Sequence, residues 1–245
     1  MQTASNTVFA QKLLRRVSAL QSPWGRARSH ASLCWDRLAW RQLQRGAAIA
    51  KRGLDIFGSG CALLLLSPLF LLIAALIRAE DGGPIIFTQV RVGKFGRVFR
   101  MYKFRSMRVD AEKRLKEILA ANQHNAGVTF KMKDDPRVTK IGKWIRKLSF
   151  DELPQFFNVL IGDMSLVGPR PPLPREVALY SLADRRRLSV QPGITCIWQI
   201  SGRAEIDFHG QVMLDVEYIE NQNIWQDIRI LRKTIPAVVS GSGAY

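Results

Sequence analysis

The feature that most constrains this chain is an uncharged, mostly apolar run from Ile56 to Ile77. An α-helix of about 22 residues would be roughly 33 Å long, enough to cross the hydrocarbon core of a bilayer. Ser67 and Pro68 interrupt the run near its middle, and a proline inside a helix removes a backbone donor and clashes with the preceding turn. The run therefore predicts a membrane helix that is broken at Ser67-Pro68.

Basic residues flank this run on both sides. Those before it are Arg37, Arg41, Arg45, Lys51 and Arg52, and those after it are Arg78, Arg91, Lys94, Arg97, Arg100, Lys103 and Arg105. Because positively charged loops prefer the cytoplasm, both ends of the run favour the same side. A straight span cannot satisfy that preference, whereas a helix that turns back at its break can. We therefore expect a basic N-terminal arm over 1–47, a re-entrant membrane helix hairpin over 48–80 and a cytoplasmic domain over 81–245.

The charge balance requires an acidic partner, because the net charge is +17 and the isoelectric point is near 10.5. Nucleic acid, anionic lipid headgroups and phosphorylated substrates are all acidic. A neighbouring membrane segment favours the last two, and we expect no nucleic-acid partner. The three cysteines lie far apart without metal-ligand spacing, which indicates neither disulfides nor a metal site and fits a reducing cytoplasm.

The basic arm allows two interpretations. Ala31, Cys34, Trp35 and Leu38 have the i, i+3, i+4, i+7 spacing of a short interfacial helix. The alternative, which we slightly favour, is a loosely ordered basic arm.

The remainder of the chain predicts an α+β domain that is mostly helical. Pro84–Val90 and Arg97–Tyr102 flank a turn over Gly93–Gly96 and are typical of a small β-hairpin. Helices are expected over 111–121, 141–147 and 225–239, the last interrupted by Pro236, and the prolines and glycines over 162–174 predict a stiff loop region.

The adjacent carboxylates Asp151 and Glu152 stand out in a chain that is poor in acids. Ser149 and Glu152 have the spacing of a capping box, so a purely structural role at a helix N-terminus is one interpretation. The same helix N-terminus favours an anion such as phosphate and an ionised Asp151, which is a carboxylate able to attack phosphorus.

Arginine and lysine residues accompany this pair. Arg170 is fixed between two prolines, and a rigid guanidinium suits bidentate contact with phosphate. Lys103, Arg105 and Arg108 lie at the end of the expected hairpin, where they form either a phosphate-binding group or a solvated basic face.

Several segments resemble the bacterial sugar transferase family, also called polyprenyl-phosphate hexose-1-phosphate transferases or monotopic phosphoglycosyl transferases. The resemblance covers about residue 48 to the C-terminus. Its motifs are Lys51–Asp55, Ser67-Pro68, Asp81–Pro84, Lys103–Met107, Asp135–Thr139, Leu148–Pro171, Pro192–Thr195 and Trp198–Arg203. The long block Leu148–Pro171 is highly specific, and the tail resembles the longer members. Cys196 stands where the family pattern suggests glycine.

The resemblance implies that Asp151 is the nucleophile in a two-step reaction. Asp151 would attack the sugar-linked phosphate of a UDP-sugar, UMP would leave, and undecaprenyl phosphate would accept the phosphosugar. Glu152 would assist, either with Asp151 as a ligand of Mg²⁺ or by managing protons and charge. Arg170 matches the family's phosphate-binding arginine. Further candidates for nucleotide or phosphate contact are Lys103, Arg105, Arg137 and Arg203.

The resemblance also implies where the enzyme acts. We expect it at the cytoplasmic face of the bacterial inner membrane, in contact with membrane lipids, at the start of exopolysaccharide, capsule or O-antigen synthesis. UDP-glucose and UDP-galactose are the leading donors. The alternative is a glycosyltransferase that acts on the same lipid and releases UDP, although no DxD-type metal motif supports it. A non-enzymatic basic scaffold leaves the Asp151 block unexplained.

Overall fold

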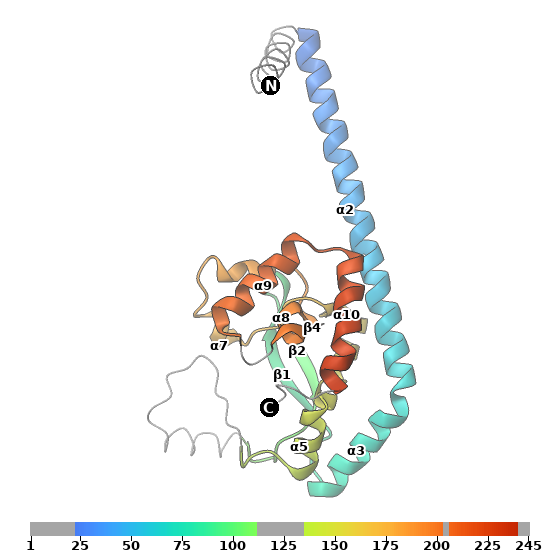
Figure 1. Ribbon diagram of the computed structural model, residues 1–245, viewed down its shortest axis with the longest axis vertical. Coiled ribbons are helices and arrows are strands. Elements are labelled where there is room, and N and C mark those ends of the chain that lie inside the picture. Colours follow the sequence, from blue (N-terminus) through green and yellow to red (C-terminus); the bar gives the residue numbers. More distant parts are fainter. Residues whose placement is uncertain (1–22, 112–134, 203–205, 240–245) are drawn as a thin grey trace, which may run out of the picture. The chain divides into compact units, whose positions relative to one another are not determined.

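The computed structural model describes the chain apart from residues 1–22, 112–134, 203–205 and 240–245. The described α-helices are α2 (Pro23–Leu65), α3 (Ser67–Asp81), α5 (Lys140–Lys147), α6 (Gln155–Ile161), α7 (Pro174–Val177), α8 (Ile197–Ser201), α9 (Phe208–Glu220) and α10 (Ile224–Val239). The strands are β1 (Ile86–Val92), β2 (Val98–Phe104), β3 (Ser165–Val167) and β4 (Gly193–Thr195), and the 3-10 turns are η1 (Lys94–Gly96), η2 (Phe150–Glu152) and η3 (Asp184–Ser189). These elements are coloured along the chain in Figure 1.

The chain divides into two units, residues 1–50 and residues 51–245, and helix α2 begins in the first unit and ends in the second. In the first unit the described residues are helical from Pro23 onward, and Trp24 and Trp35 are exposed. The expectation of a loosely ordered arm was therefore wrong from Pro23 on. The helical interpretation of 31–38 is confirmed as to its secondary structure.

The predicted break at Ser67-Pro68 is confirmed. The segments Arg45–Leu65 and Ser67–Asp81 meet at a bend of 59°. Pro68 lies in the first turn of α3, where its missing N–H is tolerated, and Ser67 Oγ donates to the carbonyl of Leu64 at 2.8 Å. In a continuous helix the N–H of residue 68 would bind the carbonyl of Leu64, but Pro68 has no N–H. The Ser67 hydroxyl takes its place as the donor to this carbonyl.

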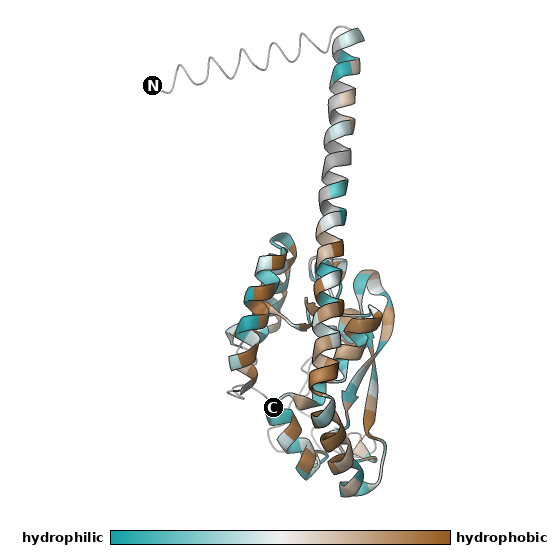
Figure 2. Ribbon diagram, turned by 90° about the vertical axis from the view of Figure 1, so that its right-hand side faces the viewer, coloured by the Kyte–Doolittle hydropathy of each residue, from teal (hydrophilic) through white to brown (hydrophobic). Residues whose placement is uncertain are grey.

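Among the described residues, no single helix combines the length and hydropathy of a membrane span, but the bent pair of α2 and α3 meets that criterion jointly. In Figure 2 the part of α2 that precedes the bend and most of α3 are hydrophobic. Several apolar side chains on this pair are exposed: Phe57, Leu64, Leu65, Leu71 and Leu72.

Helix α3 also has an inward face, which packs against the domain. Ile73 and Ile77 are buried with Phe104 of β2 and Ile145 of α5 in one apolar cluster. A second cluster joins β2, α6, β3, α9 and α10 and contains Met101, Val159, Met164, Leu166, Val167, Tyr218 and Ile230. Strand β2 contributes to both clusters, so it ties the membrane-hairpin candidate to the rest of the domain.

Strands β1 and β2 form the predicted antiparallel hairpin, with Phe87 opposite Lys103 and Arg91 opposite Phe99. Helices α5 and α10 confirm two of the predicted helices, and α10 continues through Pro236 rather than ending there. The expected helix over 111–121 lies outside the described residues after Ala111. The stiff region over 162–174 contains a strand that was not expected, β3, which pairs in parallel with β4.

Candidate active site

Asp151 and Glu152 lie in the 3-10 turn η2, which connects α5 to α6. Ser149 has a left-handed backbone with φ 55°, and the N–H of Glu152 donates to the carbonyl of Ser149 at 3.2 Å. The side chain of Ser149 caps nothing, and α6 begins only at Gln155. The predicted capping box is therefore wrong, because the tight turn already uses the N–H that the serine hydroxyl would have bound.

The pair of carboxylates is held by one lysine from the hairpin. Lys103 Nζ donates to Glu152 Oε1 at 2.7 Å and lies 3.8 Å from Asp151 Oδ2. All three side chains are largely withdrawn from solvent, with 13–21% of their surface exposed. Strand β2 thus delivers a single ammonium to two adjacent carboxylates.

The two carboxylates differ in their electrostatic surroundings. Burial alone raises the pKa of Glu152, but the combined attraction of Lys103, Arg170 and Arg91 outweighs it and the pKa falls to about 2. Burial raises the pKa of Asp151, and the charge of Lys103 only partly compensates. Glu152 is therefore a firmly ionised anchor for Lys103, whereas Asp151 is a weakly solvated carboxylate of raised basicity.

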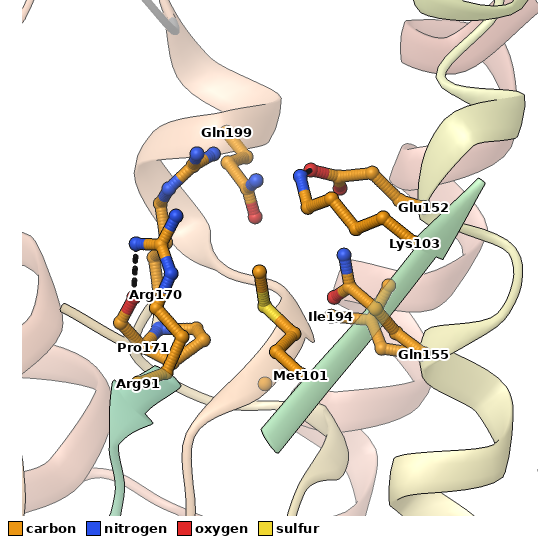
Figure 3. A pocket seen from close by; sticks show the side chains of 10 residues that line it. Arg91, Met101, Lys103, Glu152, Gln155, Arg170, Pro171, Ile194 and Gln199 are labelled. Atoms are coloured by element: carbon orange, nitrogen blue, oxygen red, sulfur yellow. Dashed lines mark hydrogen bonds and ion pairs between the residues drawn. The ribbon is translucent and has the colours of Figure 1, made fainter. Parts of the chain in front are cut away.

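Two arginines, Arg91 and Arg170, face Glu152 and Lys103 across a cavity, as Figure 3 shows. Arg91 Nη1 donates to the carbonyl of Pro171 at 2.9 Å, and Nε and Nη2 donate to Gln89 Oε1. Burial, followed by the charge of Arg170, lowers the pKa of Arg91 to about 10. Within the described residues the guanidinium of Arg170 makes no hydrogen bond or ion pair. Two neighbouring guanidinium groups therefore favour an anion in this cavity.

Arg170 is placed by the contact of two glycines. The N–H of Gly168 donates to the carbonyl of Thr195 at 3.0 Å, and the N–H of Gly193 donates to the carbonyl of Pro169 at 2.9 Å. A Cβ on either glycine would collide with the backbone of the opposite segment. The Gly168–Pro169 and Pro192–Gly193 motifs are thus explained by close approach of two chains, which presents Arg170 to the cavity.

The cavity is lined by Arg91, Met101, Lys103, Glu152, Gln155, Arg170, Pro171, Gly193, Ile194 and Gln199. Arg91, Gln155 and Gln199 were not predicted as site residues. Arg91 was identifiable in principle, because alternation along an antiparallel hairpin places it on the same face as Lys103 once the register is known. Cys196, whose Sγ donates to Gln199 Oε1 at 3.2 Å, has an extended backbone with φ −148°, so this position does not require glycine.

Two other predicted phosphate ligands, Arg105 and Arg137, do not line the cavity. Arg105 is buried and paired with Asp81 at the end of α3, and Arg137 is buried and paired with Asp135, with Nη2 2.5 Å from Oδ2. Arg203 lies outside the described residues. The structure therefore brings Asp151, Glu152, Lys103 and Arg170 together and leaves the substrate contacts of Arg105, Arg137 and Arg203 as predictions.

A candidate metal site rests on the two carboxylates alone. The described residues contain no cluster of three or more histidine, cysteine or acidic side chains suited to a metal ion. Mg²⁺ is commonly held by one or two carboxylates together with substrate phosphates. Asp151 and Glu152, of which Glu152 lines a cavity whose two arginines favour a phosphorylated ligand, fit that pattern of donors.

Comparison with known proteins places the chain among transferases. A family model described as bacterial sugar transferase matches residues 46–241. The galactosyl transferase CpsE of Streptococcus agalactiae is 56% identical over 197 residues, which are 80% of this chain and 43% of CpsE. The exopolysaccharide production protein ExoY of Rhizobium meliloti is 42% identical over 200 residues, 80% of this chain and 88% of ExoY.

A third relative is the undecaprenyl-phosphate galactose phosphotransferase of Salmonella typhimurium. It is 43% identical over 205 residues, which are 82% of this chain and 43% of that protein. The chain thus spans less than half the length of CpsE and of the Salmonella protein, and most of ExoY.

Proposed function

We propose, from the premise that this chain belongs to the bacterial sugar transferase family, that it transfers a hexose-1-phosphate from a UDP-sugar to undecaprenyl phosphate. The observation that carries the proposal is the cavity in which Glu152 and Lys103 face Arg91 and Arg170, with Asp151 next to Glu152 and 3.8 Å from the Lys103 ammonium. Phosphoryl transfer through an aspartyl intermediate requires a carboxylate nucleophile and positively charged groups that bind the phosphate.

The first step forms a bond between an Asp151 carboxylate oxygen and the sugar-linked phosphorus of the donor. The bond from that phosphorus to the oxygen that bridges the two phosphates breaks, and UMP leaves with the electron pair. Burial favours this attack, because a poorly solvated carboxylate with a raised pKa is a stronger nucleophile than one in water. The positive charge of Lys103 favours the ionised form of Asp151 and partly offsets the effect of burial.

The second step regenerates the enzyme. A phosphate oxygen of the lipid attacks the same phosphorus, the bond to Asp151 breaks, and a polyprenyl diphosphate sugar is released. Arg170 and Arg91 stabilise the negative charge on the phosphates in both steps. Glu152 keeps Lys103 beside the nucleophile.

Asp151 and Glu152 would also hold Mg²⁺ with the phosphates of the donor. When bound, this ion neutralises the diphosphate and the charge that develops on the leaving UMP.

The bent pair α2–α3 supplies the topology that the two substrates require. One substrate is a soluble, anionic nucleotide, and the other has its phosphate at headgroup depth. A re-entrant hairpin whose ends both lie on the cytoplasmic face of the inner membrane would hold the cavity at that depth, and its exposed leucines and phenylalanine supply the lipid-facing surface.

The names of the relatives support two candidates for the sugar. CpsE and the Salmonella protein are named for galactose, so galactose is the first candidate, and glucose is the second. The name of ExoY supports a place at the start of exopolysaccharide synthesis, and capsule and O-antigen synthesis are the alternatives. The competing reaction class is a glycosyltransferase that releases UDP. Purified protein, undecaprenyl phosphate, Mg²⁺ and a panel of UDP-sugars distinguish the two. Release of UMP supports the proposal, and release of UDP overturns it.

A further inference from the structure

We propose that Lys51, Tyr218 and Asp227 are positioning residues for Arg170, through which the seating of helix α2 sets the geometry of the phosphate site. The inference rests on the proposed function insofar as Arg170 binds substrate phosphate. It concerns a buried polar network on the side of β3 that faces α2, away from the acidic pair.

The network converges on one backbone carbonyl, that of Val167 at the end of β3. Lys51 Nζ donates to this carbonyl at 3.1 Å and to Asp227 Oδ2 at 2.6 Å. The hydroxyl oxygen of Tyr218 lies 3.0 Å from the same carbonyl and 2.8 Å from Asp227 Oδ1. Tyr218 and Asp227 are 1% and 0% exposed, so these contacts are shielded from water.

The charges within this network are mutually satisfied. Asp227 accepts from both Lys51 and Tyr218, and Gln222 Nε2 donates to the hydroxyl of Tyr218 at 3.2 Å. Burial and then the charge of Asp227 raise the pKa of Tyr218, which keeps its hydroxyl protonated and able to donate. The one hydroxyl proton of Tyr218 is shared between Asp227 Oδ1 and the carbonyl of Val167, so this carbonyl is held by the Lys51 ammonium and by a shared hydroxyl proton.

Only two residues separate Val167 from Arg170, and backbone hydrogen bonds hold both of them in place. Gly168 is bonded to Thr195, and Pro169 accepts from Gly193 across the glycine contact. Beyond the arginine, Pro171 accepts from Arg91 and Pro172 accepts from the N–H of Val92 at 2.9 Å. A segment with so little freedom transmits a displacement of Val167 to Arg170 instead of absorbing it.

Lys51 gives the network its link to the membrane segment. It lies in α2, five residues before the apolar run that begins at Ile56, on a helix that is continuous to Leu65. A shift of this helix along or about its axis moves the ammonium, and with it the carbonyl of Val167. A membrane-seated α2 thus places Arg170 for phosphate contact.

The same hydrogen bonds are also expected if Lys51 only anchors α2 to the domain. Another residue of α2, Arg52, provides a matched control for that role. Arg52 Nη1 donates to the carbonyl of Val159 at 2.7 Å and Nη2 to that of Leu160 at 2.8 Å. Arg52 therefore anchors the same helix to the same domain with bonds of similar length, but at α6, and within the described residues it makes no hydrogen bond to β3. Loss of Arg52 should reduce stability without an effect that depends on Arg170.

The test is a mutant cycle in nanodiscs of bacterial lipid, with kcat/KM for UMP release from the UDP-sugar and the Kd for UDP as readouts. Tyr218→Phe removes one donor and keeps the ring. The pair Lys51→Met/Asp227→Asn removes the other donor without leaving a buried charge unpaired. Each change is made in the natural chain and in an Arg170→Lys background, with Arg52→Met as the control for loss of anchoring.

We expect each network change to lower kcat/KM about tenfold in the natural chain and less than about twofold beside Arg170→Lys, because coupled residues are not additive. Arg52→Met should leave kcat/KM within about twofold of the natural value. Equal losses of kcat/KM in the natural chain and in the Arg170→Lys background would overturn the inference. So would a Lys51→Met/Asp227→Asn variant whose kcat/KM and stability both equal those of the natural chain. A natural chain that releases no UMP contradicts the proposed function alone, and the cycle is then judged by the Kd for UDP.

Discussion

Lys103 donates a 2.7 Å hydrogen bond to Glu152, and its ammonium also lies 3.8 Å from the carboxylate of Asp151. One cation thus serves two acids, but with unequal effect. Glu152 is closer and has its pKa lowered to about 2, whereas burial raises the pKa of Asp151. This asymmetry separates an anchoring carboxylate from a nucleophilic one and leads to measurable consequences.

The activity should depend on the ionisation of Asp151. Only the carboxylate attacks phosphorus, so the rate of UMP release should rise with pH through the raised pKa of Asp151. Lys103→Met removes a positive charge that favours the ionised form of Asp151, so the pKa of Asp151 rises further. The acid limb of the pH–rate profile should therefore move to higher pH by about one unit or more. Lys103→Arg retains the charge and should leave the limb in place. A limb that is unmoved in Lys103→Met would contradict this assignment.

The two acids should affect stability in opposite directions at neutral pH. A raised folded-state pKa means that ionised Asp151 destabilises the fold above its unfolded pKa, so Asp151→Asn should melt at or above the natural temperature. The lowered pKa of Glu152 contributes stability above its ordinary value of 4.5, which is lost as pH falls toward about 2. Glu152→Gln should therefore melt lower at neutral pH, with the difference vanishing in acid. Thermal melts between pH 3 and 8 in detergent would show both trends.

The close approach of Gly168 and Gly193 should tolerate no side chain. Gly168→Ala directs a Cβ at the backbone of Gln191 and Gly193, which cannot yield as a flexible side chain would. We expect a loss of roughly 2 kcal/mol or more, together with a fall in kcat/KM, since Arg170 follows two residues later. Gly53→Ala is the matched control, because this helical glycine has open space and alanine should stabilise α2 by about 0.5–1 kcal/mol. Equal melting temperatures for the two variants would refute the packing argument.

Removal of divalent metal should stop UMP release without unfolding the protein. The two carboxylates alone are a weak site, and substrate phosphates would complete it. A chelator should abolish turnover while the melting temperature of the substrate-free protein stays within about 1 °C, because the described residues contain no cluster suited to a structural metal ion. Added Mg²⁺ should restore the rate. Full turnover in excess chelator would contradict a role for the ion.

Local patterns in the sequence predicted the local structure well. The bend at Ser67-Pro68, the hairpin and helices α5 and α10 all follow from proline chemistry, turn residues and periodicity. The pairing of β3 with β4 did not follow, because it depends on two glycines that meet about 25 residues apart in the chain. Short buried strands in a proline-rich region lack an alternating pattern that would reveal them.

The candidate site was predictable as a set of residue types but not as a geometry. Asp151, Glu152 and Arg170 were identified from one specific block of sequence. The distinction between Arg170, which faces the cavity, and Arg105, which is paired with Asp81, depends on tertiary contacts that no spacing encodes. Gln199 and Gln155 were missed because uncharged amides carry little signal until neighbouring elements bring them to the same cavity.

The most direct test of the central claim is the mass of the intact protein after brief incubation with a UDP-sugar and Mg²⁺ in the absence of undecaprenyl phosphate. The account predicts an adduct of one sugar phosphate on the natural chain, located at Asp151 by peptide mapping and discharged when the lipid is added. Asp151→Asn should carry no adduct and should remain folded. An adduct that persists in Asp151→Asn, or turnover in that variant at the natural rate, would contradict the assignment of Asp151 as the nucleophile.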